Sequence, residues 1–564
     1  MEYKNETKIC QNCKQDFIVE PEDFKFYEKI KVPPPTWCPE CRSIRRMMWR
    51  NEHTWYHRKC DATGKSIISM YAPNTVYKVY DQEYWKSDAC DPLDYGKSYD
   101  FSKGFFEQFD ALFREIPHPS LIQKNNVNSD YSNHTLNLKN CYFCAGSDTA
   151  EDSSYFFGAV LRVKNCLDLH QSCDCEFCYE LIDSVKSNSL FWGQNCESCF
   201  DSILLYDCKN CNNCFGCVGL RSKSYCIFNE QYSKEEYKKE INKYWDGGWE
   251  NFKKAKTKFE ELKLKIPRKY AVITKSINVT GDDILESRNC KQCFNVRNNI
   301  ENCKFCYRAH DGSKDGYDAF IAWNNAELFY EVMSASGQNI LFSAFIWGGF
   351  NVQYSENCFD CNNIFGCVGL RNKSYCILNK QYEKSEYEKI VVKIIEAMKE
   401  KKEYGEFFPS KISPFYYNEA IVQDYFPKSK KDAIEQDFSW RDGEEKNYTI
   451  TVLNNDIPDK IKDVPDSFVK EIIECEHKGK CNDQCATAFK LTVSELQFYK
   501  KMNIPLPRLC PFCRHYNRLK LKNPMKLWHR KCMKENCTNE FETPYAPDRK
   551  EIIYCEQCYN REVY

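Results

Sequence analysis

Short apolar runs separated by polar turns fill the middle of the chain. One such run is Ser202–Tyr206, and around it cysteines recur at an offset of 18, as from Cys178 to Cys196. A fixed recurrence of short strands and turns is typical of the stacked coils of a β-solenoid, with one coil for each repeat. The pattern therefore predicts two β-solenoid-like blocks, block A at residues 136–230 and block B at residues 276–380.

The two blocks are related by an internal duplication. Residues 215–221 read Phe-Gly-Cys-Val-Gly-Leu-Arg and recur as residues 365–371, at an offset of 150. Asparagine–cysteine pairs precede both copies, and stacked coils would allow these asparagines to form ladders at the turns. The pairs are Asn140–Cys141, Asn165–Cys166, Asn195–Cys196, Asn289–Cys290, Asn302–Cys303 and Asn357–Cys358.

The block cysteines allow two interpretations. The set Cys208, Cys211, Cys217 and Cys226 recurs as Cys358, Cys361, Cys367 and Cys376, which would suit two further metal sites. Core packing is the favoured alternative, because Cys214 of one copy is Ile364 in the other and a free cysteine behaves as a small apolar residue.

Helical periodicity is found between and beside the blocks. Ser233 and Glu236 form a capping box at the start of a Lys/Glu-rich stretch that extends to about Leu264. Residues 384–403 and 100–114 also place apolar side chains at helical spacing. The expected fold class is mainly β with helical linkers, in which a cysteine-rich module at each end flanks the two β-solenoid-like blocks.

The two ends of the chain carry a second duplication, at an offset of 472. Residues 38–41, Cys-Pro-Glu-Cys, match residues 510–513, Cys-Pro-Phe-Cys. Residues 57–60 and 529–532 both read His-Arg-Lys-Cys. The two ends are therefore expected to fold as related modules.

Paired cysteines in a tight turn present two thiolates to one metal ion, and a second pair completes a tetrahedron with no open position. Structural zinc is favoured over an iron–sulfur cluster or a redox disulfide. The predicted ligand sets are Cys10, Cys13, Cys38 and Cys41; Cys481, Cys485, Cys510 and Cys513; and Cys532, Cys537, Cys555 and Cys558. The N-terminal module keeps Cys60 but has Asp81 to Tyr84 in place of the last pair, so about three Zn²⁺ ions are expected.

These cysteine motifs resemble the zinc-ribbon family with treble-clef-like cysteine pairs. The resemblance covers about 35 residues at each end and implies structural zinc; the C-terminal copy differs in its Cys-x3-Cys first pair. The N-terminal residues that carry it are Phe24, Phe26, Tyr27, Pro34, Pro35, Cys38, Pro39, Cys41 and Arg42. The central blocks resemble uncharacterised cysteine-rich bacterial proteins, a likeness that implies no function.

The chain of 564 residues is too long for one core and is expected to divide into several units. The predicted units are 1–92, an N-terminal zinc-ribbon module with a degenerate second lobe; 93–135, a helical linker; 136–230, block A; 231–275, a helical connector; 276–380, block B; 381–470, a helix and linker; and 471–564, a C-terminal double zinc-ribbon module. Its 36 cysteines fall mostly in close pairs, and the sequence has neither a leader-like apolar stretch nor a membrane-spanning run. A reducing, cytoplasmic location without membrane attachment is therefore expected.

The net charge of −1 means that a nucleic-acid surface would have to be a local patch. Basic residues do gather beside the cysteine pairs, and RNA or another nucleic acid is one partner they would suit; a protein is another. A solvated surface, with aromatic residues packed beside the metal, explains them at least as well. The candidate phosphate-binding residues are Arg42, Arg45, Arg46, Arg50, Arg58, Lys59, Arg514, Arg518, Lys520, Arg530 and Lys531.

No common catalytic motif occurs in the sequence. Asp311, Asp315 and Asp318 would suit a sugar-cleaving β-helix, although turn formation is the favoured explanation for them. The leading hypothesis is a non-enzymatic zinc-binding scaffold or adaptor that binds nucleic acid through its ends. The alternatives are a β-helix enzyme acting on polysaccharide or nucleic acid, and a cysteine-rich metal or redox store.

Overall fold

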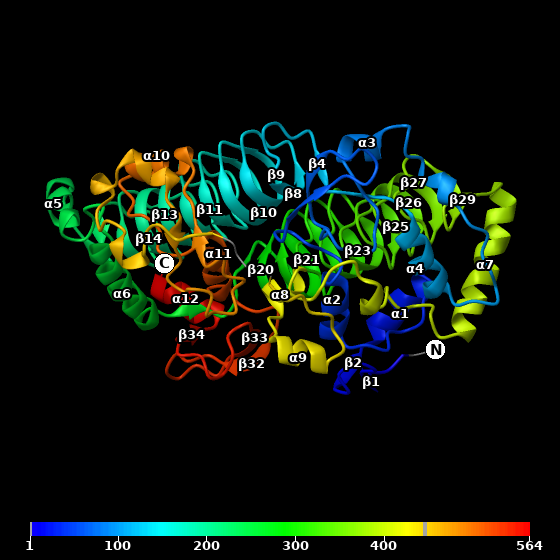
Figure 1. Ribbon diagram of the computed structural model, residues 1–564. Helices are drawn as coiled ribbons and strands as arrows, with labels where there is room; N and C mark the ends of the chain where they lie inside the picture. The colour runs from blue at the N-terminus through cyan, green and yellow to red at the C-terminus, as the bar shows by residue number, and fades with distance from the viewer. Residues whose placement is uncertain (1–2, 444–447, 564) are drawn as a thin grey trace.

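The computed structural model describes residues 3–443 and 448–563 and is mainly β, with two large sheets (Figure 1). The first sheet has 11 strands in chain order, of which only the last pair is antiparallel. Its strands are β7 (Gln123–Lys124), β8 (Ser132–Leu136), β9 (Tyr142–Glu151), β10 (Ser154–Lys164), β11 (Leu167–His170), β12 (Tyr179–Ile182), β13 (Asn188–Gln194), β14 (Phe200–Tyr206), β15 (Phe215–Val218), β16 (Cys226–Ile227) and β17 (Glu230–Gln231).

The second sheet repeats this arrangement, again with 11 strands in chain order and an antiparallel last pair. Its strands are β19 (Ile273–Thr274), β20 (Ile277–Leu285), β21 (Ser287–Val296), β22 (Ile300–Lys304), β23 (Lys314–Ala319), β24 (Glu327–Val332), β25 (Gln338–Leu341), β26 (Trp347–Gln353), β27 (Phe359–Phe365), β28 (Ser374–Ile377) and β29 (Lys380–Gln381). The prediction of a mainly β chain is confirmed.

The first sheet repeats at an offset of 12 for much of its length. Tyr179 pairs with Phe191 and Ile182 with Gln194 within the sheet. Parallel bridges at the same offset join further residues at three-residue intervals along the chain; they include Cys173 with Val185 and Glu176 with Asn188. The expectation of one coil at each offset of 18 was wrong, because that offset spans six three-residue units, whereas the backbone returns to register after four.

Every third residue of the first sheet has a left-handed backbone over long stretches. Asn195 and Ser198 have φ of 54° and 53°, and each is followed by a buried cysteine, Cys196 or Cys199. Asparagine tolerates this conformation better than most residues, which explains the recurring Asn-Cys pairs. The expected side-chain ladders are present, as in the 3.1 Å hydrogen bond from Asn128 Nδ2 to Asn140 Oδ1.

Helices precede the first sheet, connect the two sheets and form the linker after them. The capping box of Ser233 and Glu236 is confirmed at the start of α5. The helices of these regions are α4 (Phe105–Glu115), α5 (Lys234–Glu240), α6 (Trp249–Lys265), α7 (Lys384–Glu400), α8 (Val422–Tyr425) and α9 (Lys430–Glu435). Short 3-10 segments are η1 (Pro92–Tyr95), η2 (Ile241–Lys243), η3 (Ser410–Ile412), η4 (Asn454–Asp456), η5 (Ile461–Asp463) and η6 (Asp466–Lys470).

The two ends of the chain consist of β-hairpins and short helices. The N-terminal elements are β1 (Glu6–Ile9), β2 (Asp16–Val19), α1 (Pro21–Lys29), α2 (Pro39–Met47), β3 (Tyr56–Lys59), β4 (Ser66–Ser69), β5 (Val79–Tyr80), α3 (Gln82–Lys86) and β6 (His118–Pro119). The C-terminal elements are β30 (Ile473–Glu474), β31 (Ala488–Phe489), α10 (Val493–Lys501), α11 (Pro511–Lys520), β32 (Trp528–Lys531), β33 (Glu540–Thr543), β34 (Ile553–Tyr554), which pairs with β18 (Arg268–Lys269), and α12 (Glu556–Val563).

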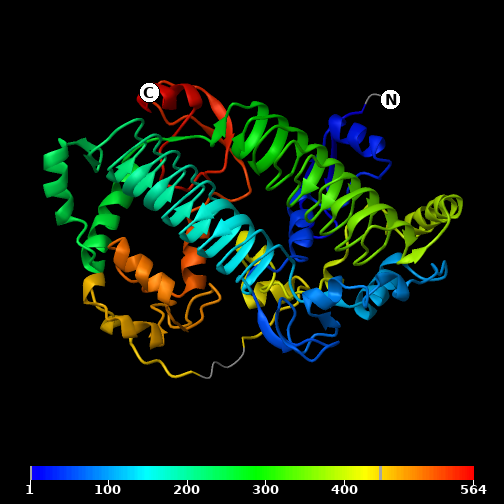
Figure 2. The same cartoon turned by 90° about the horizontal axis from the view of Figure 1, so that it is seen from above.

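The two sheets lie side by side as rows of stacked strands, and the ends of the chain pack against them (Figure 2). The rows touch directly: the rings of His134 and Phe345 stack with centroids 4.9 Å apart, and Gln171 Nε2 donates to Tyr307 Oη at 2.6 Å. Among the described residues, no helix has the length and apolarity that crossing a membrane requires.

Candidate metal centres

The first predicted ligand set converges. Cys10 lies at the end of the β1–β2 hairpin, Cys38 is the N-cap of α2, and Cys13 and Cys41 complete a group of four sulfur ligands. The Cys13 and Cys38 sulfurs are 3.7 Å apart. An ideal tetrahedron with metal–sulfur bonds of about 2.3 Å has edges of about 3.8 Å, so this spacing suits a bound metal ion.

Local backbone geometry favours a thiolate at Cys10 in this cluster. Pro39 occupies the first turn of α2, and the Cys38 backbone N–H donates to the Cys10 sulfur at 3.2 Å. Burial acts to raise the pKa of Cys10, but N–H groups of Cys38, Cys13 and Asn12 outweigh it and lower that pKa to about 7. A helix N-terminus further stabilises negative sulfur, as metal binding requires.

The second predicted set needs one correction. The four convergent cysteines are Cys475, Cys485, Cys510 and Cys513, so Cys475 takes the place predicted for Cys481. The Cys475 N–H donates to the Thr487 carbonyl at 2.8 Å, which places Cys475 at the end of the β30–β31 hairpin. Its sulfur then accepts the Cys510 N–H at 3.3 Å, the same bond that links Cys38 to Cys10.

Cys481 lies in the loop that lengthens this hairpin turn. Its sulfur is 3.7 Å from that of Cys513, and it forms a second candidate group with His477, Asp483 and Cys513. Cys513 belongs to both groups, so the two groups are alternatives: a metal ion bound by one of them would occupy the Cys513 thiolate that the other needs. The sequence signal for Cys475 was its place at the end of a short apolar strand. It follows Ile472, Ile473 and Glu474, much as Cys10 follows Ile9. Its spacing from the other cysteines gave no such signal.

The third predicted set also converges. Cys532, Cys537, Cys555 and Cys558 form a group at the β32–β33 hairpin and the start of α12. The Cys555 N–H donates to the Cys532 sulfur at 3.2 Å, and the Cys537 and Cys555 sulfurs are 3.9 Å apart. All three clusters thus share a hairpin cysteine that accepts from the cysteine at a helix start.

The second N-terminal lobe keeps this framework without the full set of cysteines. Cys60 accepts the Asp81 N–H at 3.2 Å and the Thr63 N–H at 3.4 Å. Asp81 is the N-cap of α3, and its side chain accepts the Glu83 N–H. Asp81 therefore occupies the position that Cys555 has in the C-terminal module.

The arginines beside the clusters do not form an exposed phosphate-binding surface, which corrects the prediction for six of them. On α2, Arg42 pairs with Asp318 at 2.8 Å and Arg46 with Glu331 at 2.9 Å, both carboxylates belonging to the second sheet. The buried arginines of the predicted set are Arg42, Arg45, Arg46, Arg50, Arg514 and Arg518. Arg45 also pairs with Glu331, and Arg50 pairs with Glu52.

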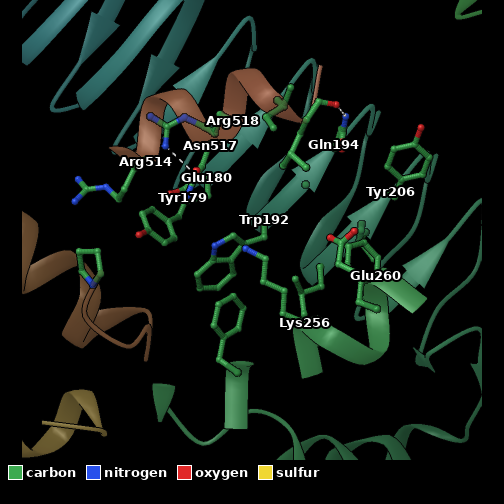
Figure 3. Close-up of a pocket in the computed structure, with 18 of the residues that line it drawn as sticks. Tyr179, Glu180, Trp192, Gln194, Tyr206, Lys256, Glu260, Arg514, Asn517 and Arg518 are labelled. Carbon is green, nitrogen blue, oxygen red and sulfur yellow. Dashed lines mark hydrogen bonds and ion pairs between the residues drawn. The ribbon is translucent and has the colours of Figure 1, made fainter. Parts of the chain in front are cut away.

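The C-terminal module makes the equivalent contact with the first sheet. Arg514 Nε is 3.0 Å from Asp168, and Arg518 lies 3.0 Å from Asp168 and 2.9 Å from Glu180. Figure 3 shows Arg514 and Arg518 on α11 beside Tyr179 and Glu180 of β12. A cavity of about 120 Å³ beside this contact is lined by apolar and charged side chains.

The remaining five basic residues of the predicted set are nearer the surface, and each has a partner. Arg58 pairs with Asp61 at 2.8 Å, Lys520 with Asp483 at 2.7 Å and Lys531 with Glu540 at 3.0 Å. Arg530 donates to the Ala546 carbonyl at 3.1 Å, and Lys59 donates to the Ser66 hydroxyl at 2.6 Å. They are divided between two modules rather than gathered in one patch.

Cys208 of block A packs as a thiol. Cys208 is fully buried, and its sulfur donates to the Tyr206 and Cys217 carbonyls at 3.5 Å. Burial raises its pKa well above the ordinary value, which favours the protonated thiol. Among the described residues, no sheet cysteine belongs to a group that could hold a metal ion.

The carboxylates considered for a β-helix enzyme belong to turns and ion pairs. Asp311, Asp315 and Asp318 all have a left-handed backbone, with φ of 57°, 52° and 57°. Asp315 accepts from Asn302 at 2.8 Å within a ladder, and Asp318 is fully buried against Arg42. Their common feature is the left-handed backbone conformation that recurs along the sheet.

Comparisons with known proteins give no family. No family model and no curated protein matches the chain. One solved structure, a protein called a putative acetyltransferase from Desulfovibrio desulfuricans G20, aligns at 13% identity over 47% of this chain and 69% of that chain. The TM-score of 0.11 is too low for this likeness to carry an argument about fold or function.

Proposed function

We propose that this protein is a non-enzymatic, zinc-stabilised scaffold whose terminal modules hold two β-solenoids together. One observation carries the proposal: two of the cysteine clusters sit at the start of a helix, α2 or α11, whose arginines are buried against carboxylates of a sheet. A metal ion bound there would fix the helix that forms the contact. Four thiolates leave no position for substrate.

Zinc is the ion that these donors favour, because closed tetrahedral sites of four cysteines are typical of structural zinc. Elemental analysis of protein purified without added metal should find about three zinc ions per chain, one for each cluster. Iron with sulfide would contradict the assignment. A count of seven or more would instead support the metal-store alternative, in which the sheet thiols also bind metal.

The β-solenoid part of the proposal rests on the register at an offset of 12 and its bridges at three-residue intervals. These features suit a narrow coil with four short sides. Deleting residues 185–196 removes one coil and should leave the following strands in register. Deleting residues 185–202 removes one and a half coils and should prevent folding. Equal tolerance of both deletions, measured by circular dichroism and thermal unfolding, would contradict the coil.

Nucleic-acid binding is the weaker proposal, because the most basic helices use their arginines inside the molecule. It would depend on exposed residues such as Lys59 and Lys531. RNA binding that weakens with salt and is lost in the Lys59→Glu/Lys531→Glu variant would support it, since phosphate contacts release counterions. Absence of binding at low salt would leave a protein as the expected partner.

A further inference from the structure

Three distant segments meet at a buried cluster of two histidines and one aspartate. His53 follows α2 in the N-terminal module, Asp424 lies on α8 of the linker, and His515 lies on α11 of the C-terminal module. The three side chains are at most 4% exposed to solvent. The cluster is separate from the cysteine groups, although α11 contributes to both.

The imidazoles of His53 and His515 both contact the Asp424 carboxylate. His53 Nε2 lies 3.1 Å from each Asp424 oxygen, and His515 Nε2 lies 3.3 Å from Asp424 Oδ2. Ligand atoms on one ion, with bonds of about 2.0–2.2 Å, are separated by about 3.0–3.5 Å, so these spacings suit a shared metal ion. The three ligand atoms all lie within 4.8 Å of one another.

The orientation of the two rings gives the same indication. The centroids of His53 and His515 are 5.4 Å apart, and the ring planes are inclined at 62°. Two imidazoles bound through Nε2 to one ion at about 2.1 Å would place their ring centres about 5 Å apart. The rings therefore need little movement to bind an ion together.

A neighbouring side chain independently points to a missing ligand. His170 is only 1% exposed, and neither of its ring nitrogens has a hydrogen-bond partner among the described residues. Its ring centre is 5.8 Å from that of His515. A buried imidazole without partners is costly, and an ion with its bound water would supply one beside it.

The cluster also borders open space. Asp424, together with Gln423, Tyr425 and Tyr516, lines a cavity of about 500 Å³. The cavity lies between the two sheets and the C-terminal module, with Asp183 and Asp283 on its walls. Of the three ligands, Asp424 lines the cavity, so a coordination position left open beside Asp424 would be reachable from it, in contrast to the closed cysteine clusters.

We propose that His53, Asp424 and His515 bind a divalent first-row transition-metal ion and leave one or more coordination positions open to the cavity. Two imidazoles and one carboxylate suit Fe²⁺, Zn²⁺ or Co²⁺ better than they suit Ca²⁺ or Mg²⁺. The inference does not depend on the scaffold proposal, since its ligands are nitrogen and oxygen rather than sulfur.

The test is titration of the full-length, zinc-loaded protein with Co²⁺ after a mild chelator has removed weakly bound metal. We expect one Co²⁺ per chain, with visible absorption that lacks sulfur-to-cobalt charge transfer and X-ray absorption showing only nitrogen and oxygen ligands. The zinc content should stay unchanged. Cobalt that displaces zinc and binds sulfur would overturn the inference, as would no binding at all.

Variants test the three ligands. Asp424→Asn preserves the size of the side chain but removes its charge and keeps only one acceptor oxygen, and it should weaken Co²⁺ binding by at least about tenfold. His53→Gln should do the same. His118→Gln is the matched control, because His118 is equally buried but hydrogen bonds to the Phe113 carbonyl. Binding unchanged in Asp424→Asn and His53→Gln would contradict the site; if both fail to fold, the wild-type absorption spectrum still decides.

Discussion

The two terminal modules pack against different sheets through the same kind of buried arginine–carboxylate contact. The N-terminal module places Arg42 and Arg46 on the second sheet, and the C-terminal module places Arg514 and Arg518 on the first. These pairs are related by the terminal offset of 472, whereas Asp168 and Asp318 are related by the central offset of 150. Both duplications thus preserve one buried ion-pair contact.

The modules differ in what lies beyond this contact. The second C-terminal lobe has four clustered cysteines, whereas the second N-terminal lobe has Cys60 with Thr63 and Asp81. The framework of hairpin and helix persists in both. Docking to a sheet, rather than the number of metal sites, is therefore the property that the two modules share.

Removing a cluster ligand should have the largest effect. Cys38→Ser and Cys510→Ser should each lower the zinc content from about three to about two and make the affected module sensitive to protease. Structural zinc sites contribute on the order of 10 kcal/mol to folding in small modules. Elemental analysis with limited proteolysis measures both outcomes, and an unchanged zinc count would contradict the ligand assignment.

Breaking the ion-pair contact should come next. Arg46→Ala and Arg518→Ala each remove one arginine from a buried ion-pair network. Glu331 keeps Arg45 and Asp168 keeps Arg514, so the cost should approach the value of about 3–5 kcal/mol that is typical of breaking a buried pair. Urea unfolding of the zinc-loaded protein measures this, and similar costs would confirm that the contacts are equivalent. Arg114→Ala, which removes an exposed pair with Asp110, is the control and should cost under about 1 kcal/mol. Costs as small as the control's would contradict the docking role.

One pair of equivalent residues, which differs in charge between the sheets, should make the stability of the two sheets respond differently to pH. The second sheet has Glu356 where the first has Tyr206, at the central offset of 150. Burial raises the pKa of Glu356 from 4.5 to about 8. The unfolded chain loses this proton at lower pH than the folded protein does, so between these values stability should fall by about 1.4 kcal/mol per pH unit.

Glu356→Gln should remove this pH dependence. Its gain in stability over the wild type should therefore be larger at pH 8 than at pH 6. Unfolding measured at both pH values, with zinc in excess, separates the carboxyl from protonation of the thiolates. Tyr206→Phe is the matched control in the first sheet and should leave the pH slope unchanged. Identical slopes for wild type and Glu356→Gln would refute the raised pKa.

Restoring the missing ligands would test whether the second N-terminal lobe can still form the metal site that the second C-terminal lobe has. Thr63→Cys, Asp81→Cys and Tyr84→Cys together with Cys60 would recreate the hairpin-and-helix arrangement of the other clusters. The triple variant should bind one additional zinc ion per chain. The Asp81→Ser variant should bind no additional zinc and keep the same zinc content as the wild type. Failure of the folded triple variant to gain zinc would show that the second N-terminal lobe has lost more than its ligands.

The smallest effect is expected inside the first sheet. Ser184 and Cys208 are separated by two periods of the ladder, and each donates to the carbonyl two positions earlier, at 3.0 Å and 3.5 Å. Cys208→Ser can keep this bond, so it should cost only about 1 kcal/mol and leave the zinc content unchanged. Loss of a zinc ion would place this thiol among the metal ligands instead.

Local spacing was enough to find most of the cluster cysteines, because a hairpin turn and the first turn of a helix each bring near neighbours together. It failed at Cys475, since Cys485 lies well beyond the usual spacing of a pair and only the pairing of β30 with β31 closes that distance. It also gave an offset of 18 rather than 12 for the repeat. Sequence identity recurs at any multiple of the three-residue unit, whereas backbone register requires four complete units.

The arginines show a second limit. Their spacing along α2 and α11 is visible in the sequence, but their carboxylate partners lie in distant segments of the chain, as with Arg42 and Asp318. Charge density alone therefore suggested a surface that the fold buries. The His53–Asp424–His515 cluster had no local signal at all, because each residue comes from a different segment.

The strand-rich centre, the two duplications and the cysteine pairs could be predicted from the sequence, because each depends on residues close together or on exact recurrence. Tertiary structure decided which thiolates converge, which arginines are buried and where distant histidines meet. Those outcomes depend on how separate segments pack, and the free energy of a buried charge or ligand group is set by partners that local spacing does not specify.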